Sequence, residues 1–140
     1  MIDVFDPSQS RPACHARVIP VGAGLLAAAL VTDLLYCRTL NAQWETFSVW
    51  LLTAGLLVAA VSGVALLFDV VLHRVTRLSW PRFSALTAAA LLSLFNAFIH
   101  SRDGYTAVAS SGLALSAAVT LILVFVGRRG WSLSDPSDAD

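Results

Sequence analysis

Four long apolar stretches, separated by short polar segments, dominate the chain. They cover residues 18–37, about 47–72, 83–99 and about 105–127. Each approaches the roughly 20 residues that an α-helix needs to cross about 30 Å of hydrocarbon. The third stretch is the shortest, and it can still span a bilayer that thins locally. The pattern therefore predicts an all-α integral membrane bundle of four transmembrane helices, arranged up-down-up-down.

The two ends of the chain differ from these stretches. Residues 1–13 and 132–140 are polar, and the C-terminal segment is acidic, which predicts mobile segments on either side of a membrane domain at 14–131. The first apolar stretch is longer than the roughly 7–15 residues of a signal-peptide core. We therefore expect it to remain in the protein as a transmembrane helix.

The arginines predict an orientation. Most of them fall on one side of the predicted spans, at Arg11, Arg17, Arg74, Arg77, Arg82, Arg128 and Arg129. Arg38 and Arg102 fall on the other side. Because arginine-rich loops stay on the cytoplasmic face, both termini and the middle loop are predicted to be cytoplasmic, in a bacterial inner membrane. Tryptophans lie near the span ends, as in an interfacial belt, at Trp44, Trp50, Trp80 and Trp131.

The composition supports the membrane interpretation. Hydrophobic residues make up 57% of the 140-residue chain and charged residues 13%, which is too apolar for an ordinary soluble domain. The formal net charge is zero and the arginines are scattered, so a nucleic-acid partner is not expected. Cys14 and Cys37 lack the spacing of a disulfide scaffold or a zinc site. The expected partners are the lipid bilayer and, within it, a second copy or another membrane protein.

Small residues recur every four positions in three of the predicted spans. Between helices in lipid the hydrophobic effect contributes little, so association depends on close packing and hydrogen bonds. The predicted contact seams are Gly24, Ala28 and Thr32 in the first span, Gly55, Ala59 and Gly63 in the second, and Gly112, Ser116 and Thr120 in the fourth.

Two aspartates interrupt the apolar stretches, Asp33 in AALVTDLLYCR and Asp69 in VALLFDVVLHR. An ionised aspartate costs about 2.5–3.5 kcal/mol at the centre of a membrane helix and less near the interface. Its side chain is too short to reach water, so each carboxylate needs a partner. Successive antiparallel spans place Asp33 near the outer face of the membrane and Asp69 near the inner face.

The same topology supplies candidate partners for these two carboxylates. Arg102 ends the third span on the side of Asp33, and Asn96 lies about one and a half turns deeper. The arginines that share the side of Asp69 are Arg17, Arg128 and Arg129. The first interpretation is a structural clamp between helices at each face.

A proton or ion path through both aspartates is the alternative, because an acid inside a membrane is also a functional candidate. Such a path needs polar positions between them, and the sequence offers Thr53, Ser62, Ser93 and Ser116.

Histidines raise the question of a cofactor. His15 and His73 fall on the predicted inner side and could form a haem or metal ligand pair, together with Cys14. His100 falls on the outer side. The chain contains no Gly-rich phosphate loop, H-E-x-x-H or G-x-S-x-G motif. We therefore expect a non-enzymatic structural or accessory membrane subunit without a cofactor, with a haem-binding or ion-handling protein as the alternative.

A set of residues spread over Cys14 to Trp131 resembles a known family pattern. The set comprises His15, Pro20, Asp33, Gly63, Asp69, Asn96, Arg102 and Gly127. On these residues the chain resembles the bacterial four-helix membrane family catalogued as domain of unknown function 2231, whose activity is not established. Two departures are Ala16, where the family tends to have proline, and the lack of a histidine early in the third span. The second departure argues against carrying a cofactor over from the family.

Overall fold

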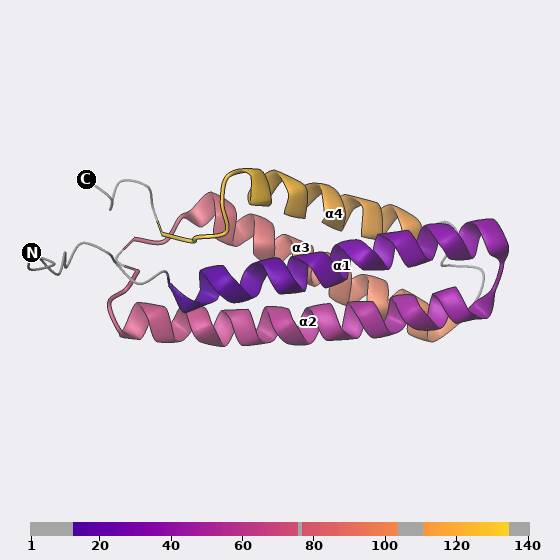
Figure 1. Ribbon diagram of the computed structural model, residues 1–140, viewed down its shortest axis with the longest axis horizontal. Helices are drawn as coiled ribbons and strands as arrows, with labels where there is room; N and C mark the ends of the chain where they lie inside the picture. The colour runs from indigo at the N-terminus through magenta and orange to yellow at the C-terminus, as the bar shows by residue number, and fades with distance from the viewer. Residues whose placement is uncertain (1–12, 76, 104–110, 135–140) are drawn as a thin grey trace, which may run out of the picture.

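The protein folds into four helices, as a computed structural model shows (Figure 1). The structure describes residues 13–75, 77–103 and 111–134, without the side chains of residues 102 and 103. The helices are α1 at Cys14–Thr39, α2 at Ala42–Val71, α3 at Trp80–Asp103 and α4 at Leu113–Arg128. The described residues form no strand, and an isolated bridge joins Leu78 to Ser134. The prediction of an all-α bundle of four helices is confirmed.

The helices alternate in direction along the chain (Figure 1). The start of α1, the end of α2, the start of α3 and the end of α4 lie at one end of the bundle, which we call the terminal end; we call the other end the distal end. Residues 104–110, which include the predicted start of the fourth span, lie outside the described residues. Helix α1 packs most extensively against α2, whereas α2 and α3 make fewer contacts with each other.

A tight connection determines the close pairing of α1 with α2. Leu40 adopts a left-handed conformation with φ of 53°, and its N–H donates to the carbonyl of Tyr36, which ends α1. The Asn41 side chain then accepts a hydrogen bond of 3.0 Å from the N–H of Gln43 and caps the start of α2. Because only Leu40 and Asn41 separate the two helices, α2 must return antiparallel beside α1.

Helix α1 begins earlier than the sequence pattern predicts. It starts at Cys14, so Pro20 lies inside the helix and not at its first turn. Proline lacks a backbone N–H, so the carbonyl one turn earlier, that of Ala16, receives no helical hydrogen bond from residue 20. The helix nevertheless continues unbroken to Thr39.

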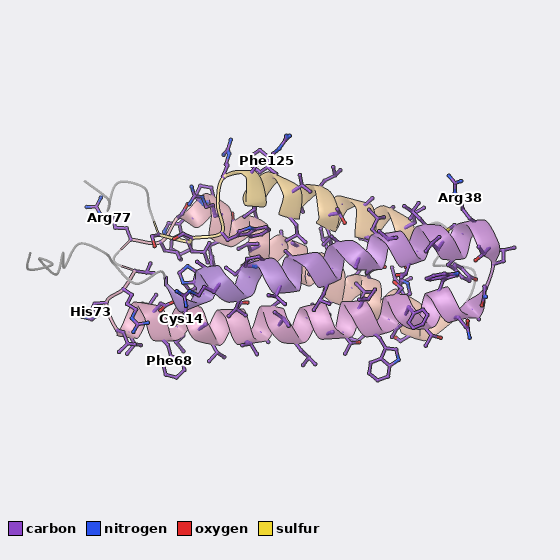
Figure 2. The ribbon with its side chains drawn as sticks, viewed as in Figure 1. Cys14, Arg38, Phe68, His73, Arg77 and Phe125 are labelled. Atoms are coloured by element: carbon purple, nitrogen blue, oxygen red, sulfur yellow. The ribbon has the colours of Figure 1, made fainter. Side chains whose placement is uncertain are left out.

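The outside of the bundle is more apolar than a water-soluble surface. Large apolar side chains point outward along the helices, including Leu57, Val61, Leu67, Phe95 and Leu121, and Figure 2 shows Phe68 and Phe125 directed away from the bundle. Three helices, α1, α2 and α3, are long and apolar enough to cross a membrane, and α4 is a shorter apolar helix. Such a contiguous apolar exterior matches lipid as the surrounding solvent.

The helices approach each other where glycines remove side chains. A Cβ at Gly55 would lie 2.6 Å from Cδ2 of Leu26, and one at Gly22 would lie 3.2 Å from Cγ1 of Val58. This seam between α1 and α2 includes Gly55, as the sequence predicts. Gly24 and Gly63 are different, because a Cβ at either position would meet nothing within 4 Å, and both are exposed.

The other small residues of the predicted seams differ in how deeply they are buried. Ala28 and Ala59 are half-buried, and Gly112 is buried. Ser116 is buried too, but within a polar cluster and not in a seam of small residues. The regular four-residue spacing therefore overestimates the seams, since each step of four residues turns about 40° around the helix and carries one end of the stripe outward, at Gly24 in α1 and at Gly63 in α2.

We expect Gly55→Ala to destabilise the bundle by about 1–3 kcal/mol, because the added methyl group overlaps Leu26 in a packed core. Gly24→Ala is the matched control, since its methyl group meets open space. Thermal unfolding of both variants in detergent, followed by tryptophan fluorescence, checks the difference. Equal melting temperatures for the two variants would contradict the close approach of α1 and α2.

Candidate functional site

The first buried polar cluster lies at the terminal end of the bundle, and we call it the Asp69 cluster. Asp69 and His15 are fully buried. The His15 backbone N–H donates to Asp69 Oδ2 at 3.0 Å, and His15 Nδ1 lies 2.8 Å from the same oxygen. On its other side, His15 Nε2 accepts the backbone N–H of Leu133 at 3.0 Å. One imidazole thus links α1, α2 and the segment after α4.

These contacts determine the proton position on His15. The N–H of Leu133 can act only as a donor, so Nε2 of His15 is the unprotonated nitrogen. The proton therefore sits on Nδ1 and is donated to the Asp69 carboxylate. The ring is neutral in this arrangement, and it leaves the charge of Asp69 without compensation from His15.

Arg74 supplies the compensating charge. Its Nη1 lies 3.5 Å from Asp69 Oδ1, an oxygen that has no hydrogen bond of its own. The separation is that of an ion pair and exceeds an ordinary hydrogen bond. The Arg74 side chain is 40% exposed, and its Nη1 also lies 3.4 Å from Sγ of Cys14. The guanidinium therefore compensates the charge of the carboxylate from a partly exposed position.

The second buried polar cluster lies at the distal end, and we call it the Asp33 cluster. Asp33 is fully buried and accepts a hydrogen bond at each carboxylate oxygen. Ser48 of α2 donates to Oδ1 at 2.5 Å, and Ser116 of α4 donates to Oδ2 at 2.5 Å. Asn96 of α3 donates its Nδ2 to the Ser116 hydroxyl at 2.9 Å. The cluster thereby connects all four helices.

His100 completes the Asp33 cluster from α3. Its Nδ1 lies 2.9 Å from the backbone carbonyl of Asn96, so this nitrogen carries a proton. Its Nε2 faces Asp33 Oδ1 at 3.4 Å. A proton on Nε2 makes the pair an imidazolium and a carboxylate, and a proton on Asp33 makes both groups neutral. Either arrangement leaves the buried pair without net charge.

The separation of the two clusters is close to the hydrocarbon thickness of a bilayer. His15 and Asp33 are separated by about 27 Å along α1, at 1.5 Å per residue, against a hydrocarbon thickness of about 30 Å. Between them lies the apolar core, formed by Ala23, Leu26, Ala29, Leu52, Ala89, Val119 and Leu123. The clusters are therefore separate sites at opposite ends of the bundle.

The hydroxyl groups between the clusters bond to their own helices. Ser62 donates to the carbonyl of Val58 and Ser93 to that of Ala89, both at 2.8 Å. Thr53, the third intermediate position, is exposed and donates to the carbonyl of Val49. Ser116, the fourth, belongs to the Asp33 cluster itself. Among the described residues, these four positions do not form a continuous polar line between the two aspartates.

The structure pairs Asp69 differently from the sequence prediction. Arg17 and Arg128 are exposed, and the groups that contact Asp69 are His15 and Arg74. Arg17 and Arg128 lie on exposed positions of α1 and α4, whereas Arg74 follows the end of α2 and contacts Asp69. Arg129 packs over the ring of Phe125, 4.4 Å from its centroid.

The structure describes one of the two predicted partners of Asp33, Asn96. Asn96 belongs to the Asp33 cluster and reaches Asp33 through Ser116. The side chain of Arg102 lies outside the described residues, so its pairing with Asp33 stays a prediction. The cation that the structure places against Asp33 is His100, when that ring is protonated.

The sequence interpretation missed the two histidine contacts. The predicted membrane side of each residue could have indicated them, because His15 shares the inner face with Asp69 and His100 shares the outer face with Asp33. Ser48 carries no such signal, since a serine on a membrane helix most often bonds to its own backbone. Its contact with Asp33 depends on which side of α2 faces the bundle. The hydrophobic pattern does not define that side, because α2 is apolar all round.

The proposed haem or metal ligand pair is not assembled as a pair in this structure. Both nitrogens of His15 are engaged, one by Asp69 and one by Leu133. His73 is exposed in the turn after α2, with φ of 55°, and Figure 2 shows it projecting at the terminal end. Within the described part of the chain, no group of three or more His, Cys, Asp or Glu side chains is placed to hold a metal ion.

Comparison with known proteins identifies the family. A family model described as predicted membrane protein, domain of unknown function 2231, matches residues 11–137. The chain belongs to this family, as the sequence resemblance indicated, and is a membrane protein. No curated protein and no solved structure matches it.

We expect His15→Ala to cost about 1–3 kcal/mol of unfolding free energy, because it removes the imidazole donor from the buried Asp69 carboxylate. His15→Asn retains an amide donor near the position of Nδ1 and should lose less. Arg17→Gln, on the exposed face of the same helix, should change stability by less than about 0.5 kcal/mol. Denaturation in detergent compares the three variants, and equal losses for His15→Ala and Arg17→Gln would refute the cluster.

A double-mutant cycle tests the pairing of Asp33 with His100. Asp33→Asn and His100→Gln should each destabilise the protein, and the double variant should cost less than the sum by about 0.5–3 kcal/mol, because the two groups share one contact. The same cycle with Arg102→Gln tests the arginine predicted from the sequence. Asp33→Asn combined with His73→Gln is the control, and it should be additive because His73 lies at the opposite end.

Proposed function

We propose that this protein is a non-enzymatic integral membrane subunit that serves a structural or accessory role without a bound cofactor. The observation that carries the proposal is the use of the interior polar groups. His15, Asp69, Asp33 and Ser116 all bond across helices, and the layer between the two clusters is apolar. Groups engaged in this way support a role in holding the bundle together, and the described residues between the two clusters form no continuous polar line.

The proposal includes a location and an orientation. The arginine distribution supports a bacterial inner membrane with both termini in the cytoplasm. In the structure, Arg17, Arg74 and Arg128 all belong to the terminal end. Figure 2 shows Arg77 at this end as well, with Arg38 at the opposite end. The terminal end is therefore the proposed cytoplasmic end.

Helix α2 supplies the proposed contact surface for partners within the membrane. It is the longest helix, at 30 residues, and 17% of its most apolar segment is buried inside the bundle. Its outward face carries Leu57, Val61, Val64, Leu67 and Phe68. Such a face packs equally well against lipid, a second copy of the chain or another membrane protein, and no charge on it favours nucleic acid.

Proton handling is a second candidate function, and the Asp33 cluster is the observation that favours it. His100 Nε2 faces Asp33 Oδ1 at 3.4 Å, so one proton can reside on either group. His15 lacks this freedom, because the N–H of Leu133 occupies its Nε2. This contact supports a proton-binding role at the distal end, whereas transport would require a polar line through the apolar layer.

We expect purified protein in proteoliposomes to conduct protons no faster than protein-free vesicles, because the apolar layer separates the two clusters. A pH-sensitive dye trapped in the vesicles measures the flux under an imposed gradient. The absorption spectrum of the same preparation, with and without dithionite, should show no Soret band. Proton flux that Asp33→Asn abolishes would overturn the structural proposal in favour of ion handling, and a Soret band lost in His73→Ala would favour haem binding.

A further inference from the structure

An apolar cavity lies between α2 and α3, and residues of α1 form its inner wall. Its volume is about 150 Å³. The floor includes buried Leu26, Ala89 and Leu123, and the rim includes exposed Gly63 and Thr87. The cavity is therefore half-open, with a closed floor inside the bundle and a mouth on the lipid-facing side.

The arrangement of the polar bonds explains why the cavity is there. Asp33 binds Ser48 of α2 and faces His100 of α3, and His15 binds Asp69 of α2. Each of these bonds includes a residue of α1. None of the cluster bonds between described residues joins α2 directly to α3. Each of these two helices is instead bonded to α1, which leaves space between them.

The chemistry of the lining decides what can occupy the cavity. The hydroxyl of Ser62 is already bonded to the carbonyl of Val58, and the remaining wall is almost entirely aliphatic or aromatic. A water molecule needs two to four polar partners, and an apolar cavity of about 150 Å³ stays dry but accepts a benzene-sized apolar molecule. Because the mouth faces the hydrocarbon of the bilayer, the available apolar occupant is part of a lipid chain.

The charge at one end of the cavity indicates which lipid headgroup would bind there. Phe83 and Leu133 line the cavity toward the terminal end. Next to them, Arg82 of α3 donates to the carbonyl of Ser132 at 2.9 Å and remains partly exposed. The one carboxylate among the described residues of this end is Asp69, which is buried and paired with Arg74. Among the described residues of this end, an anionic headgroup thus meets more positive than negative charge.

We propose that the cavity between α2 and α3 holds one acyl chain of an anionic phospholipid from the leaflet at the terminal end, with its headgroup beside Arg82. Gly63 is the position that tests the chain site. A Cβ there meets nothing within 4 Å, so Gly63→Leu can fill the mouth of the cavity without disturbing the helix. Ala60→Leu, on the exposed face of α2 and outside the cavity lining, is the matched control.

Native mass spectrometry of the full chain in detergent, with equal amounts of phosphatidylglycerol and phosphatidylcholine added, measures the occupancy. The wild-type protein and Ala60→Leu should each retain one phosphatidylglycerol, with about a fivefold preference over phosphatidylcholine for one nearby arginine. Gly63→Leu should lose this lipid while keeping its melting temperature. Arg82→Gln should keep a lipid but lose the preference, whereas Arg38→Gln at the distal end should keep both.

Several results would overturn the assignment. Retention of phosphatidylglycerol by Gly63→Leu at the wild-type level would exclude the cavity as the chain site. Equal retention of the two lipids by the wild-type protein would exclude the headgroup contact. A lipid-free dimer that Gly63→Leu converts to a monomer would assign the cavity to a second copy of the chain, and an isoprenoid quinone in the organic extract would assign it to that class of molecule.

Discussion

A buried carboxylate in hydrocarbon must find its donors within the protein, and this constraint organises the bundle. Asp33 and Asp69 are fully buried, so each accepts hydrogen bonds from a serine, a histidine or a backbone N–H of a neighbouring helix. A helix that carries such a group cannot rotate freely about its axis, because rotation would move the carboxylate into lipid. The hydrophobic pattern alone sets no such limit, since lipid-facing and core-facing positions are almost equally apolar.

Sequence reasoning reached the fold and the two aspartates but only part of their surroundings. Four apolar stretches with polar connections define four helices in lipid, and a carboxylate in such a stretch is visible without a structure. The choice of Arg17 and Arg128 for Asp69 was wrong because sidedness places a residue at a membrane face and not at an angle about the helix axis. The contacts of His15 and Ser48 depend on that angle, which forms only when the helices pack. The same reason explains why Gly55 lies in a seam and Gly24 faces outward.

The two clusters solve the same electrostatic problem in different ways. At the terminal end, a neutral His15 orients the carboxylate of Asp69, and the compensating charge comes from Arg74 at the surface. At the distal end, His100 can supply the charge itself and needs no arginine for neutrality. In the first arrangement a backbone N–H determines which nitrogen of His15 is unprotonated, while in the second Nε2 of His100 faces the carboxylate directly. The two ends of the bundle therefore place different partners against their buried carboxylates.

Helix α1 is the common bonding partner of the other three helices. Through His15 and Asp33, α1 is bonded near both membrane boundaries, and α2, α3 and α4 are each attached to it. Helices attached to a common partner need not fit each other closely, and α2 and α3 do not. The cavity between them is lined mainly by apolar side chains, which offer a water molecule few polar partners. Lipid is the component of the membrane that can fill such a gap, so the same bonds that hold the bundle together also create its lateral opening.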